Sequence, residues 1–284
     1  MPSRPRPKAG APATARAEAG TPGRDPAIAA FLEDIHNSCN RFVRLDRDPL
    51  ALVRPFADPA DLEVAGLLAS TLAFGSVDLI LRATRLVLEP LGARPAAALA
   101  ALDERSIERI WAGFQYRFCF PKDIVAILKA IRRARKEYGS LAVLFVEGDP
   151  GGEDLVEATA AFSRRLREYG GEIREGLLPD PGRGSACKRL FLYLRWMVRE
   201  DEVDPGGWQG ISRSRLVVPI DTHMARVCCD RLHFIPKPLA NLAMARRATA
   251  AFRLYAPDDP VKFDFALTRP GIDPKPGDER FACG

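Results

Sequence analysis

The stretch LVVPIDTHMARVCCDRL, residues Leu216 to Leu232, joins an apolar segment to a helical pattern. After Asp221 and Thr222, apolar residues recur at spacings of three and four, which predicts a helix ending near Leu232. An aspartate just before such a run is a common helix cap. A carboxylate at this point can also stabilise a sugar cation or assist a nucleophile. The stretch therefore leaves two roles open for Asp221, a cap and a catalytic group.

A second stretch, PDPGRGSACKRL at residues 179–190, places a turn rich in Pro and Gly before another helical pattern. Free backbone N–H groups at such a turn and helix start bind phosphate well. Lys188 falls in the first turns of this helix, where the positive end of the helix dipole lowers the pKa of an ammonium group. A partly neutral lysine can act as a nucleophile, although a lysine here can equally be solvated. Lys188 and Asp221 are 33 residues apart, a spacing that permits the two to meet but does not require it.

Helical spacing of apolar residues continues almost throughout the chain from Ile28, and no run alternates with period two between turn signals. This predicts an all-α fold, with 284 residues and 47% hydrophobic content sufficient for a substantial core. Residues 1–25, rich in Pro, Ala, Gly and Arg, are expected to form a disordered basic tail, and residues 273–284 a loose C-terminal tail. No segment predicts a transmembrane helix or a secretory signal, so a cytoplasmic, nucleoid-associated protein is expected.

Positive charge is concentrated in two parts of the chain. Residues 1–25 carry five Lys or Arg against two Asp or Glu, and residues 181–237 carry ten against six. A basic folded segment suits a polyanion partner, although a pI near 9 is also ordinary in an Arg-rich proteome. The six cysteines form no CxxC pair, so neither a metal site nor a cofactor is expected, and the thiols should be reduced and mostly buried.

The segment VPIDTHMARV is similar to the VDTH-xx-RV segment of endonuclease III and its relatives, the helix-hairpin-helix DNA glycosylases. LEVAGLLASTLAFGSVDLILRA and DFALTRPGI resemble an early and a late helix of that superfamily. The blocks FxYRF, PDPxxGSACKRL, LRWMVR, PxDTH and DPVKxDFAL resemble a bacterial family catalogued as domain of unknown function 2400, over about residues 26–272. The resemblance implies a catalytic Asp221, with His223 and Arg226 as structural members of the following helix.

The implied fold is glycosylase-like, with two helical lobes and a cleft between them. One lobe covers about residues 60–215, and the other covers 26–55 together with 221–272. Three departures from the superfamily pattern stand out. Lys188 lies four residues after the second glycine of PGRG, not two, and it precedes Asp221 by more residues than the lysine of endonuclease III precedes its aspartate. This longer separation and the modified hairpin resemble those of the archaeal 8-oxoguanine glycosylases. The iron–sulfur cysteines of endonuclease III are absent, and LAFG replaces its Gln-bearing stretch.

The resemblance implies a monomeric base-excision glycosylase acting on double-stranded DNA with a damaged or modified base, an oxidised purine being the best candidate, with or without lyase activity. A non-catalytic nucleic-acid-binding protein and a hydrolase of a nucleotide or modified nucleoside are the alternatives. Asp221 and Lys188 are the expected catalytic residues. The residues expected to contact DNA are Gly182, Arg183, Gly184, Ser185, Arg195, Arg199, Ser212 and Ser214. A pocket for the flipped base is expected from Trp111, Tyr116, Arg117, Trp196 and Trp208. Core packing is the alternative for the first four, whereas Trp208, in a Gly-rich loop, is less easily explained by packing and is expected to act as a lid or wedge.

Overall fold

The computed structural model describes residues 23–171 and 173–281. Within these ranges it contains twelve α-helices and no β-strand, so the predicted all-α class is confirmed. The helices are α1 (Pro26–Cys39), α2 (Pro59–Thr71), α3 (Val77–Leu88), α4 (Pro95–Ala101), α5 (Glu104–Ile110), α6 (Pro121–Tyr138), α7 (Leu141–Glu147), α8 (Val156–Gly170), α9 (Lys188–Val198), α10 (Thr222–Arg226), α11 (Leu242–Arg253) and α12 (Asp264–Ile272). Most of the expected N-terminal tail, residues 1–22, lies outside the described ranges.

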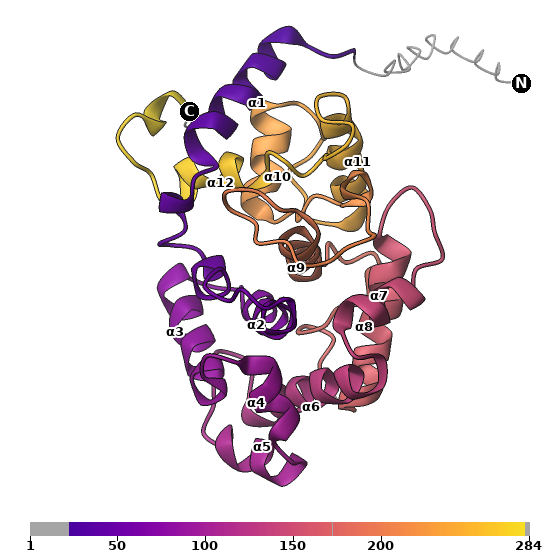
Figure 1. The fold of residues 1–284 in the computed structure, drawn as a ribbon. Helices are drawn as coiled ribbons and strands as arrows, with labels where there is room; N and C mark the ends of the chain where they lie inside the picture. The colour runs from indigo at the N-terminus through magenta and orange to yellow at the C-terminus, as the bar shows by residue number, and fades with distance from the viewer. Residues whose placement is uncertain (1–22, 172, 282–284) are drawn as a thin grey trace, which may run out of the picture.

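Helices α2 and α9 pack against each other in the middle of the molecule (Figure 1). Nearly every residue of both helices is buried, which is typical of a helix surrounded by protein on all sides. On one side of this pair, α1 and α10 both pack against α12. On the other side, α6 packs against α8 and α5. None of the described helices is long and apolar enough to cross a membrane.

The helix expected to begin near Ser185 begins at Lys188 instead. The backbone before it is not helical, because Gly184 and Cys187 both adopt the left-handed conformation, with φ of 81° and 43°. Asp180 caps a short 3₁₀ turn, Pro181–Arg183, by accepting a hydrogen bond from the Gly182 N–H. As a result, Lys188 is the first residue of α9 and lies at its N-terminal end.

Helix α10 opens at the expected place, with Asp221 as its cap. It continues into a π-helical turn, Val227–Arg231, so the helical segment ends close to the predicted Leu232. The expectation of a loose C-terminal end is wrong for the described part of it. A 3₁₀ turn, Asp278–Phe281, packs back on the N-terminal region, where Asp278 pairs with the buried Arg44 at 2.6 Å and Phe281 is buried.

Candidate active site

Lys188 and Asp221 meet at the ends of two helices. The Lys188 Nζ lies 2.9 Å from the Asp221 Oδ2. Their side chains are about one-third exposed, 34% for the lysine and 29% for the aspartate. The other oxygen of Asp221, Oδ1, accepts a hydrogen bond from the Met224 N–H at 2.8 Å. Asp221 therefore caps α10 with one oxygen and holds Lys188 with the other. The helix-cap role and a catalytic role do not exclude each other in this geometry.

The charge state of Asp221 follows from its neighbours. Burial alone would raise the pKa of this carboxyl, because it penalises the charged form. The positive charge and hydrogen bond of Lys188, together with the Met224 N–H, outweigh burial and lower the pKa below its ordinary value. Asp221 is consequently a carboxylate at neutral pH, ready to stabilise positive charge on a bound molecule.

The pair lines an open cavity of about 580 Å³. The cavity walls come from residues 47–49, from the turn between α2 and α3, from α12, and from the N-terminal ends of α9 and α10. Apolar side chains such as Phe74, Leu192 and Phe265 supply much of the wall, and charged side chains lie among them. An apolar cavity with a few converging polar groups is the usual form of a small-molecule or cofactor site.

Five charged residues of this cavity were missed by the sequence reasoning: Arg47, Asp48, Arg189, Asp264 and Arg269. Asp264 lies at the start of α12 and pairs with Arg195 of α9. Arg269 lies further along α12 and pairs with Asp48 at 3.1 Å. Asp264 and Arg269 fall within or beside the DPVKxDFAL block, whose ionisable residues on an otherwise apolar helix were the available signal.

His223, implied to be structural, packs against Gly271. A Cβ atom at position 271 would lie 2.1 Å from the His223 Cε1, so only glycine fits there without a shift. The imidazole also lines the cavity. Arg226 is exposed on α10 and does not line it.

The turn expected to hold a phosphate is exposed at residues 182–185, but the N–H groups of residues 182–184 already have partners, contrary to the expectation of free donors. The Gly182 N–H donates to Asp180 Oδ1, and the Gly184 N–H donates to the Pro181 carbonyl. Arg183 forms an exposed ion pair with Glu175 at 2.6 Å. The turn offers the Arg183 side chain to a partner more readily than it offers backbone donors.

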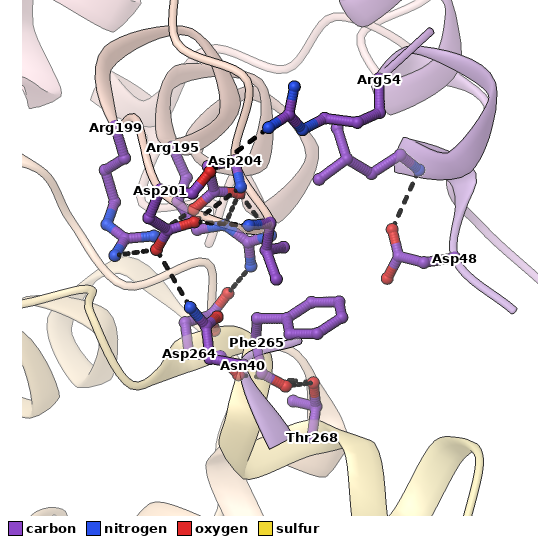
Figure 2. Close-up of polar contacts among 12 residues, drawn as sticks. Asn40, Asp48, Arg54, Arg195, Arg199, Asp201, Asp204, Asp264, Phe265 and Thr268 are labelled. Carbon is purple, nitrogen blue, oxygen red and sulfur yellow. Dashed lines mark hydrogen bonds and ion pairs between the residues drawn. The ribbon is translucent and has the colours of Figure 1, made fainter. Parts of the chain in front are cut away.

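Arg195 and Arg199 are buried and not on the protein surface, so their expected role in contacting DNA is corrected. Both are 3% exposed and belong to a buried cluster of charges, here called the sealed cluster (Figure 2), of which Arg195 and Asp264 border the cavity. The Arg195 Nη2 lies 3.0 Å from Asp204, and Arg199 also pairs with Asp204. Burial opposes the charge on Arg195, but Asp204 and Asp264 outweigh it and raise the pKa of the guanidinium. Arg199 does not line the cavity, and the three guanidinium nitrogens of Arg195 all bond to carboxylates, so neither arginine offers free donors to a phosphate.

Ser212 and Ser214 bond to each other, with 2.8 Å between their hydroxyl oxygens. Ser212 directly precedes the 3₁₀ turn Arg213–Arg215, Ser214 lies within it, and neither lines the cavity. The structure therefore does not bring them to the Lys188–Asp221 pair.

The three tryptophans expected near a base lie in the core, so core packing is correct for Trp111 and Trp196, and the lid or wedge expected of Trp208 is wrong. Trp111 donates to the Val87 carbonyl, and Trp208 donates to the Glu63 carboxylate at 3.0 Å. Trp196 is fully buried on α9. None of the three lines the cavity, because each fills space between helices.

Tyr116 and Arg117 lie closer to the expected place, against the turn between α2 and α3. A Cβ atom at Gly75 would lie 2.9 Å from the Tyr116 hydroxyl and 3.2 Å from the Arg117 Nη1. Gly75 and Phe74 line the cavity, and the Phe74 ring stacks on the exposed Phe118 ring at 4.4 Å. Tyr116 is buried beneath this turn, whereas Arg117 is exposed at the edge of the cavity.

Four of the described cysteines are buried and one is partly buried, all as free thiols, which confirms the expectation for them; Cys283 lies outside the described residues. Burial raises the pKa of the Cys187 thiol, next to Lys188, to about 11, so it is not a thiolate nucleophile at neutral pH. No group of three or more potential ligands for a metal occurs in the described part of the chain.

Comparison with known families gives one match, to a family described as "Protein of unknown function (DUF2400)", over residues 48–273. The chain belongs to this family. The matched region runs from the cavity residue Asp48 past Lys188 and Asp221 to the end of α12, so the whole cavity lies within the family's shared sequence except for Arg47. No curated protein and no solved structure matches the chain.

Proposed function

We propose that the chain is a DNA N-glycosylase with lyase activity, built on a two-lobed helix-hairpin-helix fold of the kind that its VPIDTHMARV segment resembles. The observation that carries the proposal is the 2.9 Å pairing of Lys188 with Asp221 on the wall of an open cavity. A non-catalytic binding protein has no need to hold a lysine on a carboxylate in a cavity. The proposed substrate is DNA with a damaged or modified base, and an oxidised purine is the first to test.

In the proposed reaction, the base leaves the duplex stack and enters the cavity, where water is displaced. The carboxylate of Asp221 stabilises the positive charge that develops at C1′ as the glycosidic bond stretches. Lys188, after losing a proton, attacks C1′ through Nζ. The Nζ–C1′ bond forms, the C1′–N bond breaks, and its electron pair leaves with the base, which takes up a proton.

The covalent adduct then opens the sugar ring. The nitrogen, positively charged after the attack, first loses a proton. Its lone pair then forms the C1′=N double bond, the C1′–O4′ bond breaks, and O4′ takes up a proton. This Schiff base acidifies the proton on C2′, whose removal expels the 3′ phosphate and breaks the strand. In the simpler glycosylase alternative, water replaces Lys188 as the nucleophile, and Asp221 keeps the same role.

Borohydride trapping tests the proposal, because reduction of the Schiff base leaves a stable protein–DNA adduct. Duplexes carrying a panel of damaged bases are incubated with the wild type, Lys188→Gln and Asp221→Asn. Lys237→Gln, which removes an exposed lysine outside the cavity, serves as the matched control. We expect an adduct with the wild type and the control, and none with Lys188→Gln.

The outcomes separate the versions of the proposal. If no damaged base gives an adduct that depends on Lys188, the lyase reaction is excluded. Base release that persists in Lys188→Gln but is lost in Asp221→Asn would then identify a simple glycosylase. Failure of the wild type to release any base from the panel would overturn the enzymatic proposal.

A further inference from the structure

The Arg269 side chain is an unusual feature of the cavity wall. It is only 4% exposed, yet it lines the cavity that holds Lys188 and Asp221. Its Nη2 lies 3.1 Å from Asp48 Oδ2, and its guanidinium lies 4.3 Å from the centre of the Phe265 ring. Figure 2 shows this ring projecting from α12 toward Asp48.

Two of the donors on Arg269 lack acceptors. Its Nε and Nη1 are buried, and neither has a hydrogen-bond partner among the described residues. A buried donor without an acceptor costs about 1–3 kcal/mol, so such groups are rare unless a ligand uses them. Burial also lowers the pKa of Arg269 below its ordinary value, despite the opposing charge of Asp48. By contrast, Arg195 on the neighbouring α9 has carboxylates at its Nε, Nη1 and Nη2.

Asp48 supplies acceptors beside these donors. Its side chain is largely buried and lines the same cavity. Its Oδ1 accepts from the Leu50 N–H at 3.0 Å, and its Oδ2 faces Arg269. A carboxylate can accept about four hydrogen bonds, so Asp48 has acceptor capacity left.

We propose that Arg269 and Asp48 recognise the flipped base by a lactam edge, a ring carbonyl next to a ring N–H; this inference rests on the proposed function. Arg269 donates to the carbonyl oxygen, and Asp48 accepts from the adjacent N–H. Hypoxanthine, guanine, uracil and ring-oxidised purines such as 8-oxoguanine carry this edge. Adenine and cytosine present an amino group in place of the carbonyl, which would leave the Arg269 donors unpaired.

Arginine suits this role because its planar fork matches acceptors in a fixed geometry, whereas lysine offers a single point charge. A well-placed pair of hydrogen bonds discriminates between bases by about 1–3 kcal/mol, which is about 5–150-fold in affinity. The inference therefore predicts a preference among bases that differ only at this edge.

Binding of uncleavable DNA tests the inference separately from catalysis. Duplexes carry 2′-fluoro nucleotides, which resist base release, with hypoxanthine or adenine at one position, or uracil or cytosine. An abasic analogue opposite the target base removes differences in base pairing. We expect the wild type to bind hypoxanthine over adenine, and uracil over cytosine, by at least about fivefold.

Arg269→Lys keeps a positive partner for Asp48 but loses the fork, and Asp48→Asn keeps the shape but gains donors. We expect both variants to reduce each preference to below about twofold. Affinity for a duplex whose target position is itself abasic should not change, and thermal unfolding should confirm that each variant is folded. A purely structural role for Arg269 would alter stability without altering the ratio between matched bases.

Equal binding of both members of each pair by the wild type, a preference for the amino bases, or a preference that survives both substitutions would each overturn the inference. Absence of binding to any of the duplexes would overturn it as well. A lactam preference without base release from the cleavable panel would support the inference and count against the glycosylase proposal. Base release with no lactam preference would do the reverse.

Discussion

Helix α9 carries two acid–base arrangements that differ mainly in their access to solvent. At its first residue, Lys188 pairs with Asp221 at 2.9 Å, and both side chains are about one-third exposed in the cavity. Two turns later, Arg195 pairs with Asp204 at 3.0 Å; both are buried, and only Arg195 borders the cavity. The separations are nearly the same, so proximity of opposite charges does not by itself identify a site. A charged pair can act on a ligand only where one face remains open.

The sealed cluster must satisfy itself internally, because charges removed from water lose their hydration. Asp204 receives hydrogen bonds from both Arg195 and Arg199, and Arg199 also pairs with Asp259 (Figure 2). The open pair has fewer internal partners, and solvent reaches it. The sealed cluster should therefore matter for folding, and the open Lys188–Asp221 pair should matter for chemistry.

The largest effect is expected from Asp204→Ala, which leaves two buried guanidinium groups without their shared partner. Loss of one member of a buried ion pair typically costs about 3–5 kcal/mol, so the free energy of unfolding should fall by about that amount. Chemical denaturation followed by circular dichroism measures the change. As a control, Asp78→Ala removes an exposed partner of Arg47 and should cost about 1 kcal/mol or less. Equal, small losses in both variants would show that the sealed cluster does not stabilise the fold.

Asp221→Asn should have the opposite profile. An asparagine side chain caps a helix about as well as an aspartate, so stability should change by only about 1 kcal/mol or less. The charge facing Lys188 and the sugar is lost, however, and base release should slow by about 10²–10³-fold, the usual effect of removing an electrostatic contribution to a transition state. Single-turnover assays on folded protein measure the rate. A rate that falls only in step with the folded fraction would contradict a catalytic role.

A smaller effect should appear in the pH dependence of stability. The pKa of Asp221 is lowered in the folded protein from an ordinary value of 3.8. The unfolded state therefore binds a proton on this carboxyl more readily, and the charge on Asp221 stabilises the fold fully above about pH 4. That contribution disappears as the pH falls through the lower, folded-state pKa.

The measurement compares the wild type with Asp221→Asn in urea at pH 7, 5, 4 and 3. We expect a wild-type advantage of about 1 kcal/mol or less at pH 7 and 5, because the Lys188 pair is partly exposed to solvent. The advantage should shrink from pH 4 to pH 3. A difference that stays constant down to pH 3 would show that the stabilising interaction of Asp221 does not depend on its charge.

Features that depend on near neighbours in the chain could be predicted from the sequence, whereas features that depend on how the helices pack could not. Periodic apolar spacing predicted the helical class, and the start of α10 at Asp221 followed from a local cap signal, since both depend on near neighbours in the chain. The meeting of Lys188 with Asp221 depends on how α9 and α10 pack, so the spacing could permit it but not predict it. Arg195 and Trp196 have no local signal that separates burial from exposure, because α9 is surrounded by other helices on all sides. Asp48 and Arg269 are 221 residues apart, and only the fold brings them to one wall.

The smallest effect is expected at the exposed turn before α9, through Arg183→Ala. This side chain is 66% exposed, so loss of its ion pair with Glu175 should change the free energy of unfolding by less than about 1 kcal/mol. If the turn lies against the DNA backbone, binding of all duplexes should weaken to the same degree. The slope of log affinity against log salt should also fall by about one phosphate contact. Arg105→Ala, on the distant α5, provides an exposed control that should leave the slope unchanged. An unchanged slope in Arg183→Ala would remove the turn from the DNA-binding surface, and the open pair at Lys188 would then have to be approached from another side of the cavity.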